Sequence, residues 1–121
     1  MRMHHIIIAD DEAAIRFLLG RFILRQLPSA TITEVPDASE ALRVYDERGA
    51  DALIVDYKLR GMSGIDLIRV LRDRDIKIPI ILLSGDHLAR EDALDAGATR
   101  FQYKSDPIDV LVDELIALLQ L

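Results

Sequence analysis

The sequence predicts an α/β fold in which helices cover both faces of one parallel sheet. Apolar segments of strand length alternate with segments of helical periodicity five times along the 121 residues. Four of the apolar segments are continuous, which is typical of parallel strands buried on both faces. The remaining one, residues 31–35, alternates polar and apolar side chains, so we expect it at an edge of the sheet with one face exposed.

The order of the segments indicates how the chain is wound. Strands are predicted near residues 5–9, 31–35, 52–55, 79–83 and 99–102, and helices near 12–26, 38–48, 64–74, 88–96 and 107–120. Right-handed crossovers then favour a flavodoxin-like, doubly wound (βα)5 sandwich of three layers, with a parallel sheet of order 2-1-3-4-5. In that order the switch point lies between the first and third strands.

Helices are indicated by apolar residues at helical spacing and by the residues that bound them. The first helix should end before Pro28, the second should end at Gly49, and the third should begin near Gly64. The predicted inward stripes of these three helices are Ile15, Leu18, Leu19, Phe22 and Ile23; then Ala38, Ala41, Leu42 and Tyr45; and then Ile65, Ile68 and Leu71.

The last helix carries two apolar lines. The line expected to pack on the sheet is Ile108, Leu111, Val112, Leu115 and Leu119, and the second is Val110, Ala117, Leu118 and Leu121. A contiguous extra apolar line on a surface helix suggests a contact with a partner. We therefore expect this helix to contact a partner protein or a second copy of the chain.

Length, charge and composition limit the class of protein. At 121 residues the chain, 1–121, is expected to form a single domain. A net charge of −6 argues against direct nucleic-acid binding, which depends on Lys and Arg neutralising phosphates. No apolar run approaches a membrane span and the start is too short for a signal peptide, so we expect no membrane contact and a cytoplasmic location.

Each continuous apolar run ends on a polar side chain. Asp10 and Asp11 follow the first, and Asp56, Ser84 and Lys104 follow the later ones. Open parallel sheets place their chemistry at the carboxyl ends of the strands, so these groups should share one crevice. Clustered carboxylates repel one another unless a cation is bound, and Mg²⁺ suits an open crevice with oxygen ligands. The lysine and hydroxyl could then hold the outer oxygens of a phosphoryl group, with one carboxylate as nucleophile.

A simpler explanation is that Asp10 or Asp11 only caps the first helix, which is a common use of aspartate. For either residue alone that explanation would be preferred. It does not account for Asp56, Ser84 and Lys104 at the same predicted edge, so we favour the shared crevice.

Over its whole length the sequence resembles the receiver domain of two-component response regulators. The segments that carry the resemblance are residues 6–12, with their acidic pair; Asp56 followed by Met62 and Gly64; Ser84 with Gly85; and Lys104. The combination is specific, whereas any one of these segments alone would be a weak signal.

The resemblance implies that Asp56 accepts a phosphoryl group from a histidine kinase or phosphotransfer protein. It implies that Mg²⁺ is bound by Asp10, Asp11, Asp56 and the backbone carbonyl of Lys58. An output domain or a separate downstream protein would read the modification, and the chain would be a switch in a phosphorelay with slow self-dephosphorylation rather than a turnover enzyme.

The resemblance also assigns residues around the bound phosphoryl group. Ser84 and Lys104 would bind its oxygens, and Gly85 would leave space for it. Phe101, three residues before Lys104, occupies the position of the switch aromatic and would swing inward as Ser84 moves. The surface of the last two βα units would then change.

Two departures and one tuning hypothesis accompany this assignment. Ser105 follows Lys104 where the family commonly has a proline after a cis peptide. Of all the site residues, Lys104 is therefore the one whose position the resemblance defines least. Arg60 replaces a frequent proline in the loop after the phosphoacceptor, with little expected effect. Lys58 and Asp86 stand at variable positions near the phosphoryl group, where they either pair and slow the attack of water or remain two solvated charges.

Two other functions remain open at this point. A Mg²⁺-dependent aspartyl-phosphate hydrolase also uses an aspartate nucleophile at a strand end, but such enzymes commonly need a second acid where this chain has Lys58. A degenerate receiver acting as a constitutive docking module is the other possibility. The complete acidic set argues against it.

Overall fold

The computed structural model describes residues 3–120 and confirms the predicted fold. Within that range the strands are β1 (His5–Ala9), β2 (Thr31–Val35), β3 (Ala52–Asp56), β4 (Ile80–Ser84) and β5 (Arg100–Tyr103). The helices are α1 (Ala13–Gln26), α2 (Ala38–Arg48), α3 (Gly64–Asp73), α4 (Ala89–Ala96) and α5 (Ile108–Leu119). All strand pairs are parallel and the order is β2-β1-β3-β4-β5, as the sequence indicates.

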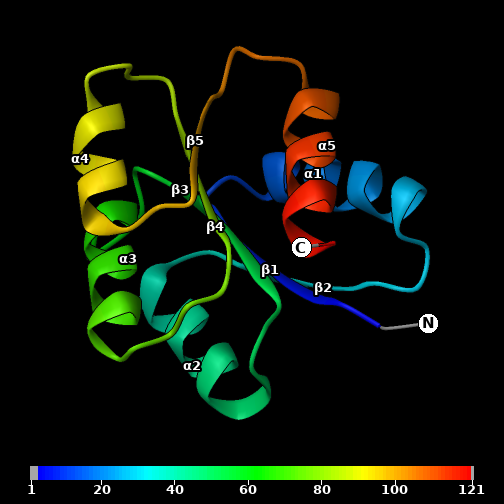
Figure 1. Cartoon of the computed structure of the whole chain (residues 1–121), viewed down its shortest axis with the longest axis horizontal. Coiled ribbons are helices and arrows are strands. Elements are labelled where there is room, and N and C mark those ends of the chain that lie inside the picture. Colours follow the sequence, from blue (N-terminus) through cyan, green and yellow to red (C-terminus); the bar gives the residue numbers. More distant parts are fainter. Residues whose placement is uncertain (1–2, 121) are drawn as a thin grey trace.

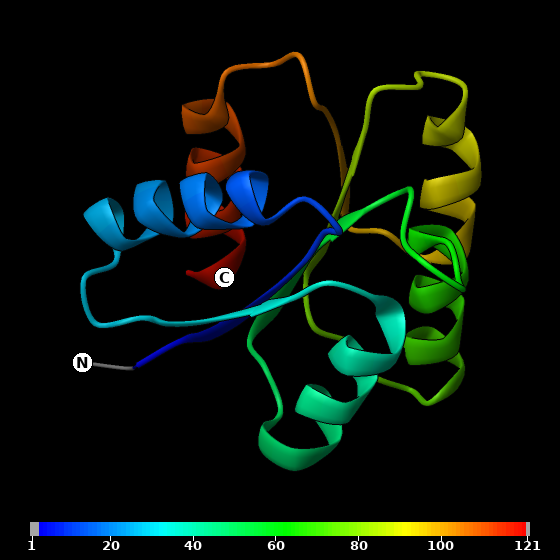
Figure 2. The ribbon, with the colours of Figure 1, turned by 180° about the vertical axis from the view of Figure 1, so that it is seen from behind.

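The sheet separates two layers of helices (Figures 1 and 2). Helices α1 and α5 lie on one face, and α2, α3 and α4 cover the other. Because every strand runs in the same direction, all of its carboxyl-terminal loops meet at one edge. The loops that follow β4 and β5 rise at the top of Figure 1.

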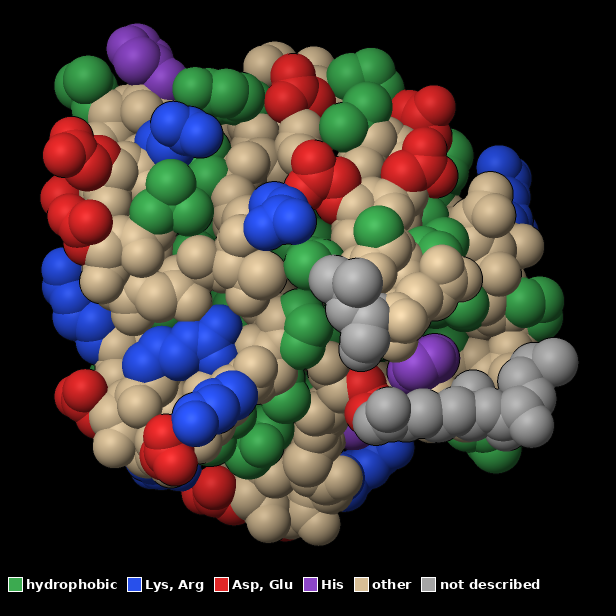
Figure 3. Space-filling model, viewed as in Figure 1, with side chains coloured by type: hydrophobic (Ala, Val, Ile, Leu, Met, Phe, Trp, Pro, Cys, Tyr) green, Lys and Arg blue, Asp and Glu red, His purple; other side chains and the backbone are tan. Residues whose placement is uncertain are grey.

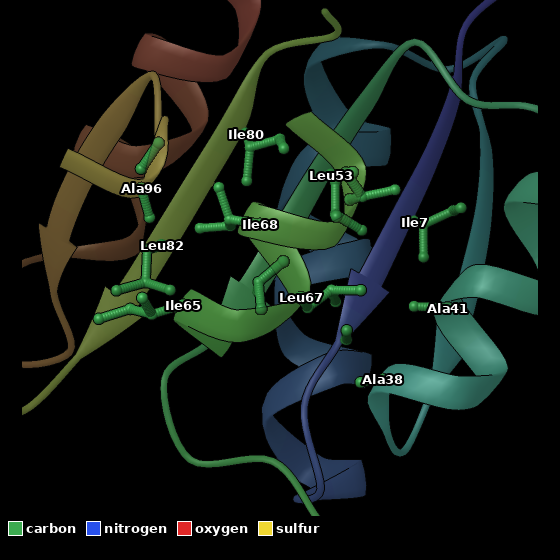
Figure 4. Close-up of a cluster of buried hydrophobic side chains, with 14 of the residues drawn as sticks. Ile7, Ala38, Ala41, Leu53, Ile65, Leu67, Ile68, Ile80, Leu82 and Ala96 are labelled. Carbon is green, nitrogen blue, oxygen red and sulfur yellow. The ribbon is translucent and has the colours of Figure 1, made fainter. Parts of the chain in front are cut away.

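Each face of the sheet has its own hydrophobic core. Side chains of α3 that include Ile65, Leu67 and Ile68 point toward the strands in the larger core (Figure 4). The continuous apolar run of β3 is fully buried because residues on its two faces fill the two cores alternately. Because β3 lies between two other buried strands, β1 and β4, the residue at its carboxyl end is held in position from both sides.

Polar side chains cap the N-termini of two helices. Asp37 caps α2 by accepting a hydrogen bond from the Glu40 backbone N–H at 2.9 Å, and Ser63 caps α3 through the Asp66 N–H at 3.1 Å. These caps satisfy backbone donors that have no partner within a helix. None of the helices within residues 3–120 combines the length and hydropathy needed to cross a membrane.

The predicted second apolar line on α5 is wrong in part. Leu118 is buried in the core formed with α1 rather than on the surface, and Leu121 lies outside the described residues. Val110 remains 42% exposed. In α1, Leu18 is 44% exposed although its spacing placed it on the inward stripe, because the inner face of the helix is centred on Leu19 and Ile23.

Candidate functional site

Three carboxylates meet at the carboxyl-terminal edge of the sheet. Asp10 follows β1, Asp56 is the last residue of β3, and Asp11 is exposed beside them. Each offers one oxygen, and these oxygens lie within 4.8 Å of one another. The sequence placed the three residues at one edge, and the structure brings them together at the switch point between β1 and β3.

The environment of Asp10 disfavours the ionised form of its carboxyl group. Its side chain is buried, and burial is the main reason that its pKa rises from 3.8 to about 6. The negative charges of Asp56 and Asp11 raise the pKa as well, whereas the hydrogen bond from the Glu12 backbone N–H to Oδ1 and the charge of Lys104 lower it.

One oxygen of the Asp10 carboxylate has no hydrogen-bond partner among the described residues. Its Oδ2 is buried and accepts no hydrogen bond from any group within residues 3–120. A buried carboxylate oxygen without a partner is costly, and a cation would offset that cost. The set of hard oxygen donors from Asp10, Asp11 and Asp56 therefore fits a Mg²⁺ ion.

Asp56 faces a positive charge on its other side. The Lys104 Nζ lies 3.0 Å from Asp56 Oδ1. Burial raises the pKa of Asp56 above its usual range, while the hydrogen bond and charge of Lys104 oppose the rise. For Lys104, burial acts to lower the pKa, but the hydrogen bond and charge of Asp56 outweigh burial and the pKa is raised. Both side chains are thus favoured in their charged forms by each other.

Ser84 ends β4 next to this pair. Its hydroxyl donates to the Asp86 carbonyl at 3.3 Å and accepts from the Asp86 backbone N–H at 2.9 Å, so it is engaged within its own loop. Seven residues at this edge of the sheet line an open cleft of about 340 Å³: Asp56, Tyr57, Lys58, Ser84, Gly85, Asp86 and Lys104. A Cβ at Gly85 would meet open space, which agrees with an accessible cleft.

A close approach fixes the loop between β3 and α3. A Cβ at Gly64 would lie 2.3 Å from the Asp56 carbonyl oxygen and 2.8 Å from Val55 Cγ1, so only glycine fits there. The Gly64 N–H also donates to the Tyr57 carbonyl at 2.8 Å. The start of α3 therefore packs directly on the residue that ends β3.

Phe101 lies on β5, on the face that carries α4. It is half-buried, packs against the larger core and meets Tyr103 edge to face, with ring centroids 5.1 Å apart. Leu82 is its partner on β4, two residues before Ser84. Phe101 therefore lies on an edge strand of the sheet, next to the strand that ends at Ser84.

The variable positions and the loop after Lys104 are also defined. Lys58 and Asp86, both among the described residues, form no ion pair with each other, and the Asp86 carboxylate instead accepts from the Leu88 N–H at 2.9 Å. No peptide bond within residues 3–120 is cis, so the bond between Lys104 and Ser105 is trans. The N-cap residue of α1 is Glu12, so Asp10 and Asp11 precede the cap.

Three residues near the site did not stand out in the sequence. Arg16 donates from Nη1 to the Asp10 carbonyl at 2.6 Å and lies 3.4 Å from Glu34. Gln102 and Asp106 hydrogen bond beside Lys104. The expectation that the last strand is buried on both faces is wrong: β5 is the other edge strand of the sheet, and Gln102 is its one buried residue. Polar residues already interrupt this segment in the sequence, and that interruption is a signal that could have found Gln102; no pattern in the sequence singles out Arg16.

Curated relatives share this sequence over most of its length. The two-component response regulator PhoP of Pseudomonas aeruginosa is 35% identical over 117 residues, which cover 95% of this chain and 51% of that protein. The regulatory protein VirG of Rhizobium rhizogenes is 31% identical over 102 residues, which cover 82% of this chain and 41% of that protein. The chain spans about half, or less, of the length of these relatives.

Solved structures share the fold. A two-component response regulator of the LuxR family from Aurantimonas sp. is 30% identical, with a TM-score of 0.89 over 98% of this chain and 86% of that one. The receiver domain of a Francisella response regulator, 24% identical, has a TM-score of 0.87 over 97% of both chains and agrees in fold. The description of the response regulator receiver domain family matches residues 6–116. Because that match covers nearly the whole chain, the chain belongs to the response regulator receiver domain family.

Proposed function

We propose that this receiver domain is a phosphorylation switch in which Asp56 accepts the phosphoryl group with the help of Mg²⁺. The observation that carries the proposal is the position of Asp56 between two kinds of charge. Its carboxylate lies with those of Asp10 and Asp11 on one side and 3.0 Å from the Lys104 ammonium on the other. A nucleophile with a cation site and a fixed ammonium beside it is suited to phosphoryl transfer.

The transfer needs an ionised carboxylate and a site that stabilises the incoming charge. A carboxylate oxygen of Asp56 forms a bond to phosphorus as the bond between phosphorus and the donor's imidazole nitrogen breaks, and the electron pair stays on that nitrogen. Lys104 favours the ionised form of Asp56 and attracts the phosphoryl oxygens. Hydrolysis reverses the modification when water attacks phosphorus, releasing inorganic phosphate and the free carboxylate.

The donor set for the metal consists of Asp10, Asp11, Asp56 and the backbone carbonyl of Lys58. When bound, Mg²⁺ would neutralise negative charge on the phosphoryl oxygens. The buried and unpartnered Oδ2 of Asp10 supports this assignment, because the oxygen lies among the described residues with no other group to satisfy it. Asp10 thus has a role even though it is not the acceptor.

The output of the switch would pass through Ser84 and Phe101. The Ser84 hydroxyl, now bonded within its own loop, would turn to the phosphoryl oxygens, which carry about −2 of added charge. Phe101 would then move inward and change the face formed by α4, β5 and α5. The two positions bias a conformational equilibrium that exists before modification. Gly85 keeps the approach open, while Lys58 and Asp86 line the cleft and would tune the lifetime.

The proposed partners follow from this chemistry. A histidine kinase or phosphotransfer protein supplies the phosphoryl group, and an output domain or a separate protein reads the changed face. A phosphorylation-dependent homodimer is one form that this reading could take. We further propose that the chain acts as one domain and in the cytoplasm, where such donors are found.

Beryllofluoride with Mg²⁺, which mimics a bound phosphoryl group, tests the site. Titrated into isotope-labelled protein, it should shift the NMR signals of residues at the ends of β1, β3 and β4 and then those of the face formed by α4, β5 and α5. Asp56→Asn, which keeps the shape of the side chain but removes the acceptor charge, is the matched control and should show no saturable response.

Two outcomes would contradict the proposal. One is an absence of shifts in the wild-type chain at millimolar Mg²⁺, which would favour a constitutive docking module. The other is steady release of phosphate from small phosphoesters, which would favour a hydrolase. The exposed Lys58, in the place where a hydrolase commonly has its second acid, leads us to expect no such turnover.

A further inference from the structure

We propose that Gln102 and Asp106 are positioning residues that hold Lys104 in place for the phosphoryl group. The inference rests on the proposed function of Lys104. It concerns a structural problem that the sequence raises, since Ser105 follows the lysine and leaves the backbone freer there than a proline would.

Lys104 lies in a tight turn. The turn begins at Tyr103 and closes at Asp106, whose backbone N–H donates to the Tyr103 carbonyl at 3.1 Å. Lys104 and Ser105 are its central residues. On the strand side, the Lys104 N–H donates to the Ser84 carbonyl at 3.0 Å. The backbone of the lysine is therefore held between the end of β4 and the residue that closes the turn.

A side-chain hydrogen bond spans the same turn. The Gln102 Nε2 donates to the Asp106 Oδ2 at 2.5 Å. Asp106 is thus held twice, by its backbone to Tyr103 and by its carboxylate to Gln102. The two bonds bracket Lys104 and Ser105, so they restrict the turn where the sequence itself is permissive.

Gln102 is not an incidental surface residue. It is 7% exposed, and it pairs with Leu83 on β4, on the face that packs with α1 and α5. A buried amide costs free energy unless it is hydrogen bonded. An apolar side chain would fill this position in the sheet without that cost. The hydrogen bond to Asp106 therefore explains why a polar residue stands here.

The consequence for the site is a fixed origin for a long side chain. The Lys104 side chain is 32% exposed and has four rotatable bonds, yet its Nζ lies 3.0 Å from Asp56 Oδ1. Holding the backbone of the turn limits how far the ammonium can move from the acceptor. Small displacements of a charged group from the phosphoryl oxygens weaken binding strongly.

A double-mutant cycle tests the inference through beryllofluoride affinity in the presence of Mg²⁺. Asp106→Ala should weaken affinity about three- to tenfold, the usual loss for one hydrogen bond. In the Lys104→Ala background the same substitution should have little further effect, because there is no ammonium left to misplace. Gln102→Leu, which keeps the buried volume, should reproduce the effect and serves if Asp106→Ala does not fold.

Two further variants separate positioning from general stability. Asp106→Asn keeps an acceptor for Gln102 and should restore affinity to within about twofold of wild type. Thr99→Val removes the hydroxyl that accepts from the Ile80 N–H at 3.0 Å, immediately before β5 and at the other end of that strand from the turn. It should lower the free energy of unfolding without changing affinity.

A second measurement needs no ligand. The ¹³C shift of the Lys104 Cε in the free protein reports its contact with Asp56, so it should change in Asp106→Ala and stay unchanged in Asp106→Asn and Thr99→Val. Equal losses of affinity in both lysine backgrounds, or an unchanged Cε shift, would overturn the inference. Failure of the wild-type chain to bind beryllofluoride would instead contradict the proposed function, and the Cε shift would still decide the role of Gln102 and Asp106.

Discussion

At the scale of single residues, the site buries two carboxylates, Asp10 and Asp56, although an ionised carboxylate is more stable in water. Asp10 is a carboxylate with 1% of its surface exposed and one oxygen unpartnered among the described residues. Asp56 is nearly as buried, yet it has Lys104 to stabilise its charge. The protein thus retains at Asp10 a charge that costs stability without a cation, and such a cost is expected at a functional position.

Replacing Asp10 tests this cost. The pKa of Asp10 is raised from 3.8 to about 6, so the folded state binds the proton more tightly than the unfolded chain does. The associated stability is complete below the unfolded pKa and is lost as pH rises through about 6. In metal-free protein at about pH 7.5, Asp10→Asn should therefore raise the free energy of unfolding by about 1 to 3 kcal/mol.

The pH dependence provides the control for that measurement. At about pH 4 the carboxyl is already mostly protonated in the folded state, so wild type and variant should differ little. Urea unfolding at both pH values measures the difference. A variant that is less stable than wild type at the higher pH would contradict the cost assigned to Asp10.

Gly64 allows a second test at the residue scale. Gly64→Ala would place a Cβ against the Asp56 carbonyl and the Val55 side chain, in backbone that has no room to move, and should cost about 2 to 4 kcal/mol. Gly20→Ala, in α1, is the matched control, because its Cβ would lie 3.5 Å from Ile32 Cγ2 of β2, which is an ordinary van der Waals contact. That control should be neutral or slightly stabilising in thermal unfolding, by up to about 1 kcal/mol. Equal effects of the two substitutions would argue against the close approach.

At the scale of the elements, the side chain of one arginine connects a helix to the segments that precede β4 and β5. Arg72, near the end of α3, donates from Nε to the Gly97 carbonyl and from Nη1 to those of Ile76 and Ile78, at 2.8 to 2.9 Å. Its Nη2 contacts the Thr99 hydroxyl at 3.4 Å. Burial holds the pKa of Arg72 below its usual range. This arginine therefore ties the end of α3 to the turn between α4 and β5.

Removing the guanidinium should separate these elements. Arg72→Met keeps much of the apolar stem but leaves three backbone carbonyls without their donor, so we expect a loss of about 2 to 4 kcal/mol in urea unfolding. Arg69→Ala removes an exposed arginine of the same helix that pairs with Asp66 and should change stability by less than about 0.5 kcal/mol. A loss no larger for Arg72→Met than for this control would refute the role of the tie.

The elements themselves could be read from the sequence because their apolar periods are strong. Each observed strand and helix begins and ends within one residue of its predicted bounds, and the alternating pattern of residues 31–35 placed β2 at the edge. Spacing alone could not tell which of two adjacent apolar lines on α5 faces the sheet, so Leu118 was misplaced. The depth of a line depends on the angle at which the helix packs, and a one-dimensional pattern does not contain that angle.

The site divides in a similar way. The positions of Asp10, Asp56 and Lys104 follow from where the apolar runs end, and parallel strands bring such ends together. The bond between Gln102 and Asp106 was not predictable, because it depends on which face of β5 is buried and on the shape of the turn after it. Roles in the phosphoryl transfer remain predictions for each residue.

At the scale of the whole molecule, charge and exposed apolar surface limit what the chain contacts. The net charge is −6, and acidic, basic and hydrophobic side chains are interspersed over the face seen in Figure 3. The exposed large apolar residues among those described are distributed over several elements: Phe17, Leu18 and Leu24 on α1, Leu88 and Leu94 at α4, Val110 on α5, and Met3 before β1. Such scattered residues are normal on a monomer.

The unmodified chain should therefore be monomeric. With Leu118 in the core, the apolar surface left on α5 is too small to supply the roughly 1,000 Å² that a stable interface buries. Sedimentation velocity without phosphoryl donor should give a single monomeric species, and the same experiment with beryllofluoride tests whether modification creates a dimer. A dimer before modification would show that another face mediates association.

The central claim is that the carboxylate of Asp56 becomes covalently modified. The most direct measurement is the intact mass of the protein after incubation with acetyl phosphate and Mg²⁺, with Asp56→Asn treated in parallel. We predict an increase of about 80 Da in the wild-type chain, the mass of one phosphoryl group, and none in the variant. An unchanged wild-type mass, or the same increase in both proteins, would contradict the account.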